Sequence, residues 1–257
     1  MNAGGVKARC YVPPGEWSPG GLLTVSGDEA HHLLHVLRIR PGMEVSCFDG
    51  RGMEGLASVS SIGHRQIFLE IVEKRQVRSF PWEVSLGAAI PRHGKLDQIL
   101  DQATQLGASR VIPLVTTRGV VKITPQESAK KLSRWSQIVV ESGKQAEVSY
   151  LPEVLPATPW DSAVKNFADY DRVLLAAVDG PHEEMERILS FGNPRRLLVL
   201  IGPEGDFTPE EIRQACAAGA RRFSLGPTVL RCDTAAVVAL GLLFYLLRKG
   251  SVQTAEG

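Results

Sequence analysis

Two glycine-bearing loops carry the residues best placed for chemistry, and each follows an apolar strand and opens a helix. The first has the sequence GPEGDF at Gly202–Phe207, and the second has LGPTVLRCD at Leu225–Asp233. Glycines at strand ends let a ligand approach the main chain, and paired loops of this kind hold flat, nucleoside-like ligands in α/β proteins. Arg231 and Asp233, at the end of the second loop, are charged side chains that could stabilise charge or transfer a proton.

Both loops also have a purely structural interpretation. Thr208, Pro209 and Glu211 form a capping box with proline at the first helical position, which an ordinary helix start would also have. Asp233 is suited to cap the following helix, and Arg231 to form a salt bridge. Neither a GxGxxG motif after a strand nor a GxxxxGK[ST] motif occurs, so a dinucleotide or P-loop site is a poor interpretation.

The elements around these loops alternate between strand and helix. Apolar runs predict strands at Glu83–Ile90, Arg110–Val115, Arg172–Val178 and Arg196–Ile201, as expected of parallel strands covered on both faces. Apolar stripes predict helices at Lys95–Leu106, which Gly107 ends, and at Pro125–Gln145. The last apolar run, Ala235–Leu247, is too short to span a bilayer, and we expect a fully buried helix in the core or in a subunit interface. This alternation predicts a doubly wound α/β domain.

The first part of the chain is expected to form a small β-barrel. Short strands are predicted at Leu22–Val25, Glu44–Phe48, Leu56–Ile62 and Gln66–Val72, with a hairpin-type turn at Asp49–Gly52 and a helix that starts at Gly27. Lys74–Trp82 is charged, contains proline and lacks periodicity, so we place the boundary there. The predicted domains are residues 1–78 and 79–257.

Composition limits the possible partners. The net charge is +1, so a nucleic acid would have to be bound by local patches of positive charge. Cysteines occur at Cys10, Cys47, Cys216 and Cys232, with no CxxC pair or zinc spacing, which favours reduced thiols in the cytoplasm. His31, His32 and His35 lack the carboxylate of a HExxH motif, so we expect no metal site. A signal-peptide pattern is also absent, and we expect a cytoplasmic protein that does not bind membranes.

The two loop motifs together, GPEG and LGPxxLRxxTA, resemble the SPOUT methyltransferases. More narrowly, the chain resembles the RsmE family over nearly its whole length. The matching segments are Arg9–Pro13, His31–Arg38, Phe48–Gly50, Lys95–Asp97, Gln105–Gly107, Ile112–Leu114, Arg118 and Arg134–Trp135. The resemblance implies a SPOUT-type parallel-sheet domain with a C-terminal trefoil knot, plus a small N-terminal PUA-like β-barrel that binds RNA. It also implies a homodimer that uses S-adenosylmethionine to methylate N3 of a uridine in 16S ribosomal RNA of the small subunit.

The resemblance further implies roles for individual residues. The cofactor would be bound by Ala177, Ile201, Gly202, Pro203, Glu204, Gly205, Leu225, Gly226, Val229, Leu230, Thr234 and Ala235. Arg231 would stabilise or orient the uracil, and Asp233 or Glu204 would accept its proton. RNA would be held by Arg9, Arg38, Arg40, Arg51, Arg92 and Arg118. Because N3 lies on the Watson–Crick edge, the target base must be unpaired or flipped out.

Several positions depart from the family pattern. The family usually has a second glycine at Asp206, a glutamate at Gln105 and at Asp233, lysine-glycine at Arg92-His93, and an arginine soon after the position of Gln145. These departures leave two alternatives. One is another SPOUT enzyme, such as a ribose 2′-O-methyltransferase, and the other is a non-catalytic RNA-binding factor in ribosome assembly.

Overall fold

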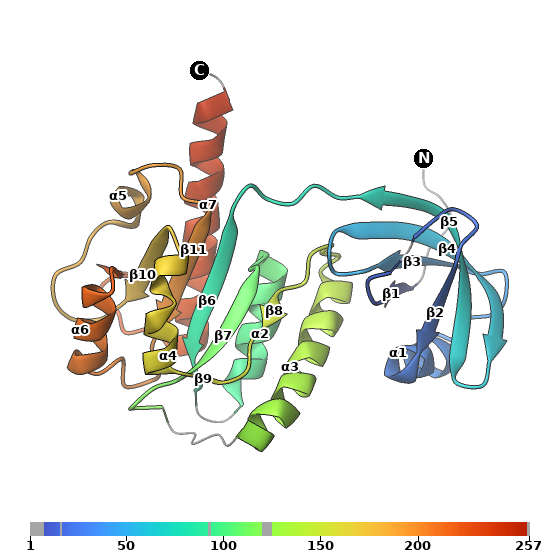
Figure 1. Ribbon diagram of the computed structural model, residues 1–257, viewed down its shortest axis with the longest axis horizontal. Helices are drawn as coiled ribbons and strands as arrows, with labels where there is room; N and C mark the ends of the chain where they lie inside the picture. Colours follow the sequence, from blue (N-terminus) through green and yellow to red (C-terminus); the bar gives the residue numbers. More distant parts are fainter. Residues whose placement is uncertain (1–7, 16, 92–93, 120–124, 256–257) are drawn as a thin grey trace. The chain divides into compact units, whose positions relative to one another are not determined.

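The computed structural model describes residues 8–15, 17–91, 94–119 and 125–255. The chain divides into two compact units, labelled by element in Figure 1. Unit 1 comprises Met1–Ser79 and Gly143–Leu151, and unit 2 comprises Phe80–Ser142 and Pro152–Gly257. The chain therefore returns to unit 1 through a short segment from the middle of the sequence, and no sequence pattern indicates this return.

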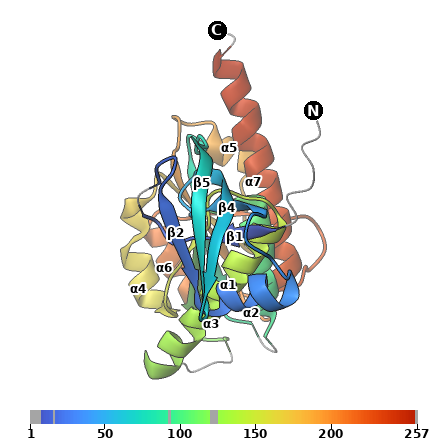
Figure 2. The same ribbon diagram turned by 90° about the vertical axis from the view of Figure 1, so that its right-hand side faces the viewer.

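Unit 1 is built on one five-stranded sheet with the order β1-β3-β4-β5-β2. The strands are β1 (Arg9–Tyr11), β2 (Leu22–Ser26), β3 (Glu44–Phe48), β4 (Met53–Gly63) and β5 (Gln66–Gln76). Figure 2 shows β2, β5, β4 and β1 in this order across the sheet. Among the residues that the structure describes, β1 and β2 do not pair with each other, so the predicted barrel is a half-barrel with two edges. The helix predicted from Gly27 is confirmed as α1 (Gly27–His31), which continues into the π-helical turn η1 (His32–Val36).

Unit 2 contains a parallel sheet with the order β12-β10-β11-β6-β7-β8, and β9 also pairs with β7. The strands are β6 (Glu83–Ala89), β7 (Arg110–Val115), β8 (Glu153–Val154), β9 (Thr158–Pro159), β10 (Arg172–Ala176), β11 (Arg196–Ile201) and β12 (Arg221–Phe223). Residues 197–201 of β11 are all buried, as the unbroken apolar run predicts for a central strand. The predicted α/β class is thereby confirmed.

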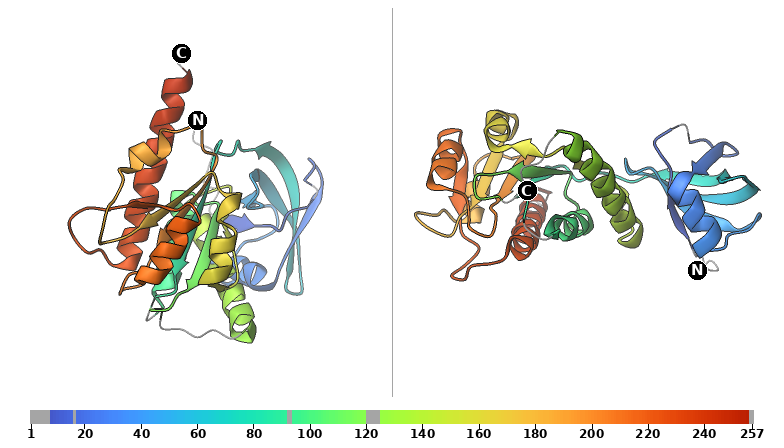
Figure 3. Two further views of the ribbon diagram at one scale, coloured as in Figure 1. Left: turned by 60° about the vertical axis from the view of Figure 1, so that its left-hand side comes forward. Right: turned by 90° about the horizontal axis from the view of Figure 1, so that it is seen from below.

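Helices cover both faces of this sheet. They are α2 (Lys95–Leu106), α3 (Pro125–Gln145), α4 (Trp160–Lys165), the 3-10 turn η2 (Phe167–Asp169), α5 (Met185–Leu189), α6 (Pro209–Ala217) and α7 (Cys232–Ala255). Figure 3 shows α2 and α7 on one face and α4 and α6 on the other. Within the single chain Ala235–Leu247 is not fully buried, because Leu242 and Tyr245 are 45% and 64% exposed, so the core alternative is excluded and burial in a subunit interface stays a prediction. An all-apolar helix needs only one face to pack on the sheet, and its composition does not say what covers the other.

The strand order brings three loops to one edge of the sheet. Because β12, β10 and β11 are adjacent and parallel, the loops at residues 177–184, 202–208 and 224–231 all leave from neighbouring carboxyl ends. This edge is where open α/β sheets bind ligands. Among the described residues, none of the helices is both long and apolar enough to cross a membrane.

Candidate active site

The three loops surround a cavity of about 800 Å³, within the usual range for a small-molecule site. The predicted cofactor residues among its lining are Ala177, Ile201, Gly202, Pro203, Glu204, Gly205, Leu225, Gly226, Val229, Leu230 and Ala235. Thr234, also predicted, is exposed on the first turn of α7 and is not part of the lining. The structure thus gathers nearly all of the predicted set around one hollow.

A carboxylate holds the first loop in place. The predicted capping box of α6 is confirmed, because Thr208 Oγ1 accepts a hydrogen bond from the Glu211 amide and Glu211 Oε2 accepts one from the Thr208 amide. The buried Glu211 carboxylate also accepts a hydrogen bond of 2.7 Å from the Thr117 amide, which follows β7. The hydrogen bond from Thr117 joins the start of α6 to the end of β7, so the Glu211 carboxylate also positions the cavity wall.

Asp206 explains how the chain tolerates one departure from the family pattern. Its φ is +60°, in the left-handed region that favours glycine. The side chain offsets this cost, because its carboxylate accepts hydrogen bonds from the Phe207 amide at 2.7 Å and the Val178 amide at 3.2 Å. The second bond joins the loop after β11 to the loop after β10. Asp206 therefore closes one wall of the cavity by linking two loops.

The second loop presents apolar side chains to the cavity. Val229 is 73% exposed, although valine normally avoids water, and it lines the cavity with Leu225 and Leu230. Gly226 has a φ of +118°, which a residue with a side chain rarely adopts. At the first loop, a Cβ on Gly202 would lie 3.0 to 3.1 Å from Asp206 Oδ1 and the Phe207 amide, so only glycine fits without a shift. An apolar, glycine-lined hollow of this size fits an adenosyl group.

The three predicted catalytic residues lie at this end of the sheet in different surroundings. Glu204 is exposed and lines the cavity, whereas Arg231 is exposed just before α7 and outside the lining. Asp233 lies within α7, which begins at Cys232, so it does not occupy the cap position. Its Oδ1 is 3.5 Å from Nζ of Lys95, which begins α2. Burial, and then the nearby Glu204 carboxylate, raise the pKa of the Cys232 thiol.

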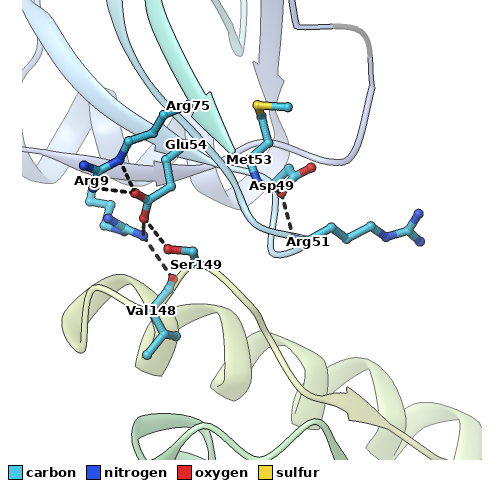
Figure 4. A network of polar contacts seen from close by, with 8 residues as sticks. All are labelled: Arg9, Asp49, Arg51, Met53, Glu54, Arg75, Val148 and Ser149. Atoms are coloured by element: carbon cyan, nitrogen blue, oxygen red, sulfur yellow. Dashed lines mark hydrogen bonds and ion pairs between the residues drawn. The ribbon is translucent and has the colours of Figure 1, made fainter. Parts of the chain in front are cut away.

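Arg9, predicted to contact RNA, is instead engaged inside unit 1 (Figure 4). Its Nη2 donates to Glu54 Oε1 at 2.8 Å and to the Val148 carbonyl at 3.0 Å, and its guanidinium lies 4.5 Å from the Phe48 ring centre. Glu54 also accepts hydrogen bonds from Ser149 and Arg75. This network ties the segment Gly143–Leu151 to β1 and β4.

Two opposing effects set the pKa of Glu54. Burial acts to raise it, but the hydrogen bonds from Ser149, Arg9 and Arg75 outweigh burial, so the pKa lies below its ordinary value. The carboxylate is therefore stabilised in its ionised form, as a buried charge with several donors should be.

The other predicted RNA contacts belong to both units. Arg38, Arg40 and Arg51 are exposed on unit 1, and Figure 4 shows the Arg51 guanidinium pointing away from the Glu54 network. Arg92 lies outside the described residues. Arg118 lines the cavity in unit 2 and donates hydrogen bonds to the Gly205 and Phe207 carbonyls, which supports the first loop.

The sequence assigned no individual role to several residues at the cavity. Asp179, Arg213, Arg222 and Cys232 line it, and Lys95 lies beside Asp233. Arg222 lies on the strand just before the second loop, so the rule that ligands bind at carboxyl strand ends would have drawn attention to it. A second cavity, of about 440 Å³, lies along the sheet face below α4 and η2, and its lining runs from Glu83, Arg110 and Arg196 at the amino-terminal strand ends to Leu114 and Leu200. In the part of the chain that the structure describes, no group of three or more His, Cys, Asp or Glu side chains is arranged to hold a metal ion.

Known families match both units. The family described as the RNA methyltransferase domain matches residues 78–244, and the RNA methyltransferase PUA domain matches residues 25–72. A Legionella pneumophila methyltransferase, solved with the bound cofactor SAM, has a TM-score of 0.83 and 31% identity over 91% of this chain and 96% of its own. The fold and loops thus define the class as an α/β RNA methyltransferase with an N-terminal PUA domain.

More specific relatives narrow this class. Ribosomal RNA small subunit methyltransferase E of Synechocystis is 31% identical over 88% of this chain and 73% of its own length, and the Bacillus subtilis protein of the same name is 27% identical over 86% and 89%. The Neisseria gonorrhoeae member, solved with S-adenosyl methionine, has a TM-score of 0.83 and 26% identity over 93% and 97%. The chain belongs to the ribosomal RNA small subunit methyltransferase E (RsmE) family, which confirms the resemblance seen in the sequence.

Proposed function

We propose that this chain transfers a methyl group from S-adenosylmethionine to N3 of a specific uridine in 16S ribosomal RNA, in the cytoplasm. The observation that carries the proposal is the cavity of about 800 Å³ between the two glycine-bearing loops at neighbouring strand ends. The loop residues Ile201–Gly205 and Leu225–Leu230 would hold the adenosyl group. When bound, the cofactor supplies an activated methyl group.

The chain's own residues must prepare the uracil. Arg231 is exposed beside the cavity, and its positive charge would stabilise the uracil once N3 has lost its proton. Glu204 lines the cavity, and Asp233 is held by Lys95 close by, so either carboxylate would accept that proton. Arg38, Arg40 and Arg51, exposed on the PUA domain, would contact RNA phosphates, and Arg118 would contact RNA from the rim of the cavity.

We also infer a homodimer and a knotted backbone. The exposed apolar side chains Leu242 and Tyr245 lie on α7, and a second copy of the chain would cover them. The SPOUT resemblance implies a trefoil knot, in which the C-terminal segment would thread through a loop of unit 2. That segment would consist of the second glycine-bearing loop and α7, which follows it directly.

Nucleoside mass spectrometry of ribosomal RNA from a deletion strain tests the proposal. We expect one 3-methyluridine of 16S RNA to disappear, to return with the wild-type gene, and to stay absent with Arg231→Ala. Calorimetry on the purified Arg231→Ala protein is expected to show unchanged affinity for S-adenosylmethionine. Loss of a ribose-methylated nucleotide instead would indicate the 2′-O-methyltransferase alternative, and unaltered methylation with defective subunit assembly would indicate the assembly factor.

A further inference from the structure

Arg222 is a cavity residue whose charge has no ion-pair partner among the residues that the structure describes. It is the middle residue of β12, and its side chain is partly buried and lines the cavity. Its Nε is buried and lacks a hydrogen-bond partner. Within the described ranges, the guanidinium also makes no ion pair, whereas the neighbouring Arg221 pairs with Glu183. Buried polar atoms are normally hydrogen-bonded, so an unpartnered guanidinium nitrogen beside a cavity points to a partner supplied by a ligand.

The guanidinium of Arg222 lies close to Gly180, in the loop after β10. A Cβ on Gly180 would lie 2.6 Å from Nη2 and 2.7 Å from Nη1 of Arg222, and 3.0 Å from its Cζ. A side chain at position 180 would therefore displace the guanidinium from its present place beside the loop after β10. The backbone of Gly180 also has a φ of +89°, which favours glycine for a second reason.

The other cations of the cavity are already engaged. Arg118 donates to the carbonyls of the first loop, and Arg213 forms an ion pair with Glu210. Among the described lining residues, only Arg222 adds a positive charge that the protein leaves without a partner. The exposed carboxylates Asp179 and Glu204 line the same cavity, so it offers separate positions for an anionic and a cationic group of one ligand.

We propose that Arg222 binds the carboxylate of the cofactor's amino-acid moiety. This inference rests on the proposed function, because it takes the cavity to be the cofactor site. That carboxylate is the only anionic group of S-adenosylmethionine, and a guanidinium suits it because two parallel N–H donors match two oxygens. Arg222 would thus make the site selective for nucleosides that carry an amino acid over truncated ones.

Two ligands and two arginine variants test this role by calorimetry. S-adenosylhomocysteine carries the carboxylate, and 5′-methylthioadenosine keeps the adenosyl group without it. We expect Arg222→Gln to weaken S-adenosylhomocysteine binding by about tenfold to a hundredfold and to leave 5′-methylthioadenosine unchanged. Arg222→Lys should give an intermediate loss for the first ligand. Arg221→Gln, the matched control on the same strand, should alter neither affinity.

The outcomes separate carboxylate binding from a structural role and from RNA binding. Equal losses for both ligands would show that Arg222 only supports the fold of the cavity, and would overturn the inference. Unchanged binding of both, with weaker RNA binding in a filter assay, would assign Arg222 to a phosphate and overturn it too. If the wild-type chain binds 5′-methylthioadenosine as tightly as S-adenosylhomocysteine, the proposed role of Arg222 is refuted while the proposed cofactor site stands. If wild type binds neither ligand, the proposed function fails and this inference fails with it.

Discussion

Replacing Glu54 should release the segment Gly143–Leu151 from the PUA domain. The Glu54 and Arg9 side chains are only 9% and 16% exposed to solvent, whereas the Arg75 side chain is 78% exposed. The Arg75 pair is therefore a surface pair worth less than about 1 kcal/mol. Removing the carboxylate leaves the Arg9 guanidinium buried beside Phe48 without its partner, and a loss of this kind costs about 3 kcal/mol.

Hydrogen exchange measures this cost locally. In Glu54→Ala, amides of β4 and of Gly143–Leu151 should exchange roughly a hundredfold faster, while those of β11 in unit 2 keep their protection. The matched control is Glu153→Ala, because Glu153 also pairs with an arginine, Arg110, but both partners are exposed. We expect less than about 1 kcal/mol there. Similar exchange in the two variants would refute the claim that the Glu54 network holds the segment.

Three further predictions rest on the same geometry. Because the folded-state pKa of Glu54 is lowered, its contribution to stability is fully present above the ordinary glutamate pKa of about 4.3 and is lost as pH falls through the folded value. The protection factors of the β4 amides, which correct for the intrinsic pH dependence of exchange, should be steady from about pH 7 to 5 and fall below that range, less steeply in Glu54→Gln. An equal fall in both proteins would count against this linkage. Asp206→Ala removes two hydrogen bonds and keeps the left-handed backbone, so calorimetry should show cofactor affinity falling by about tenfold. Asp206→Gly should lose less affinity, because glycine favours this backbone conformation. An unaltered affinity in Asp206→Ala would contradict the loop-linking role. Leu242→Asp places a charge on the exposed face of α7 and should convert the expected dimer to a monomer in light scattering. Glu153→Ala, at an exposed position, is the control. A monomeric wild type would reject the dimer.

Local patterns predicted the parts of the fold that depend on neighbouring residues. The run Leu197–Ile201 indicates a central strand because both faces of such a strand are buried. Thr208 and Glu211 form their capping box within four residues of sequence, so it can be recognised before any tertiary contact is known. The glycines of the two loops were likewise visible, since strand ends that approach a ligand favour them.

Long-range contacts account for the features that the patterns could not predict. Arg9 looked like a surface cation, but its partner Val148 is 139 residues away along the chain. Among the described residues Arg222 Nε has no hydrogen-bond partner, which depends on the place of β12 beside β10 and cannot be seen from neighbouring residues. For α7, composition cannot tell a face packed on the sheet from a face left for another copy of the chain.

A crystal structure of the chain with S-adenosylhomocysteine would show whether the cavity binds the cofactor. We expect the ligand's adenine against Leu225–Leu230 and its ribose near Ile201–Gly205, in the cavity at the carboxyl ends of β10, β11 and β12. Ligand density at the opposite end of the strands, or loops left without contact at a saturating concentration, would contradict it.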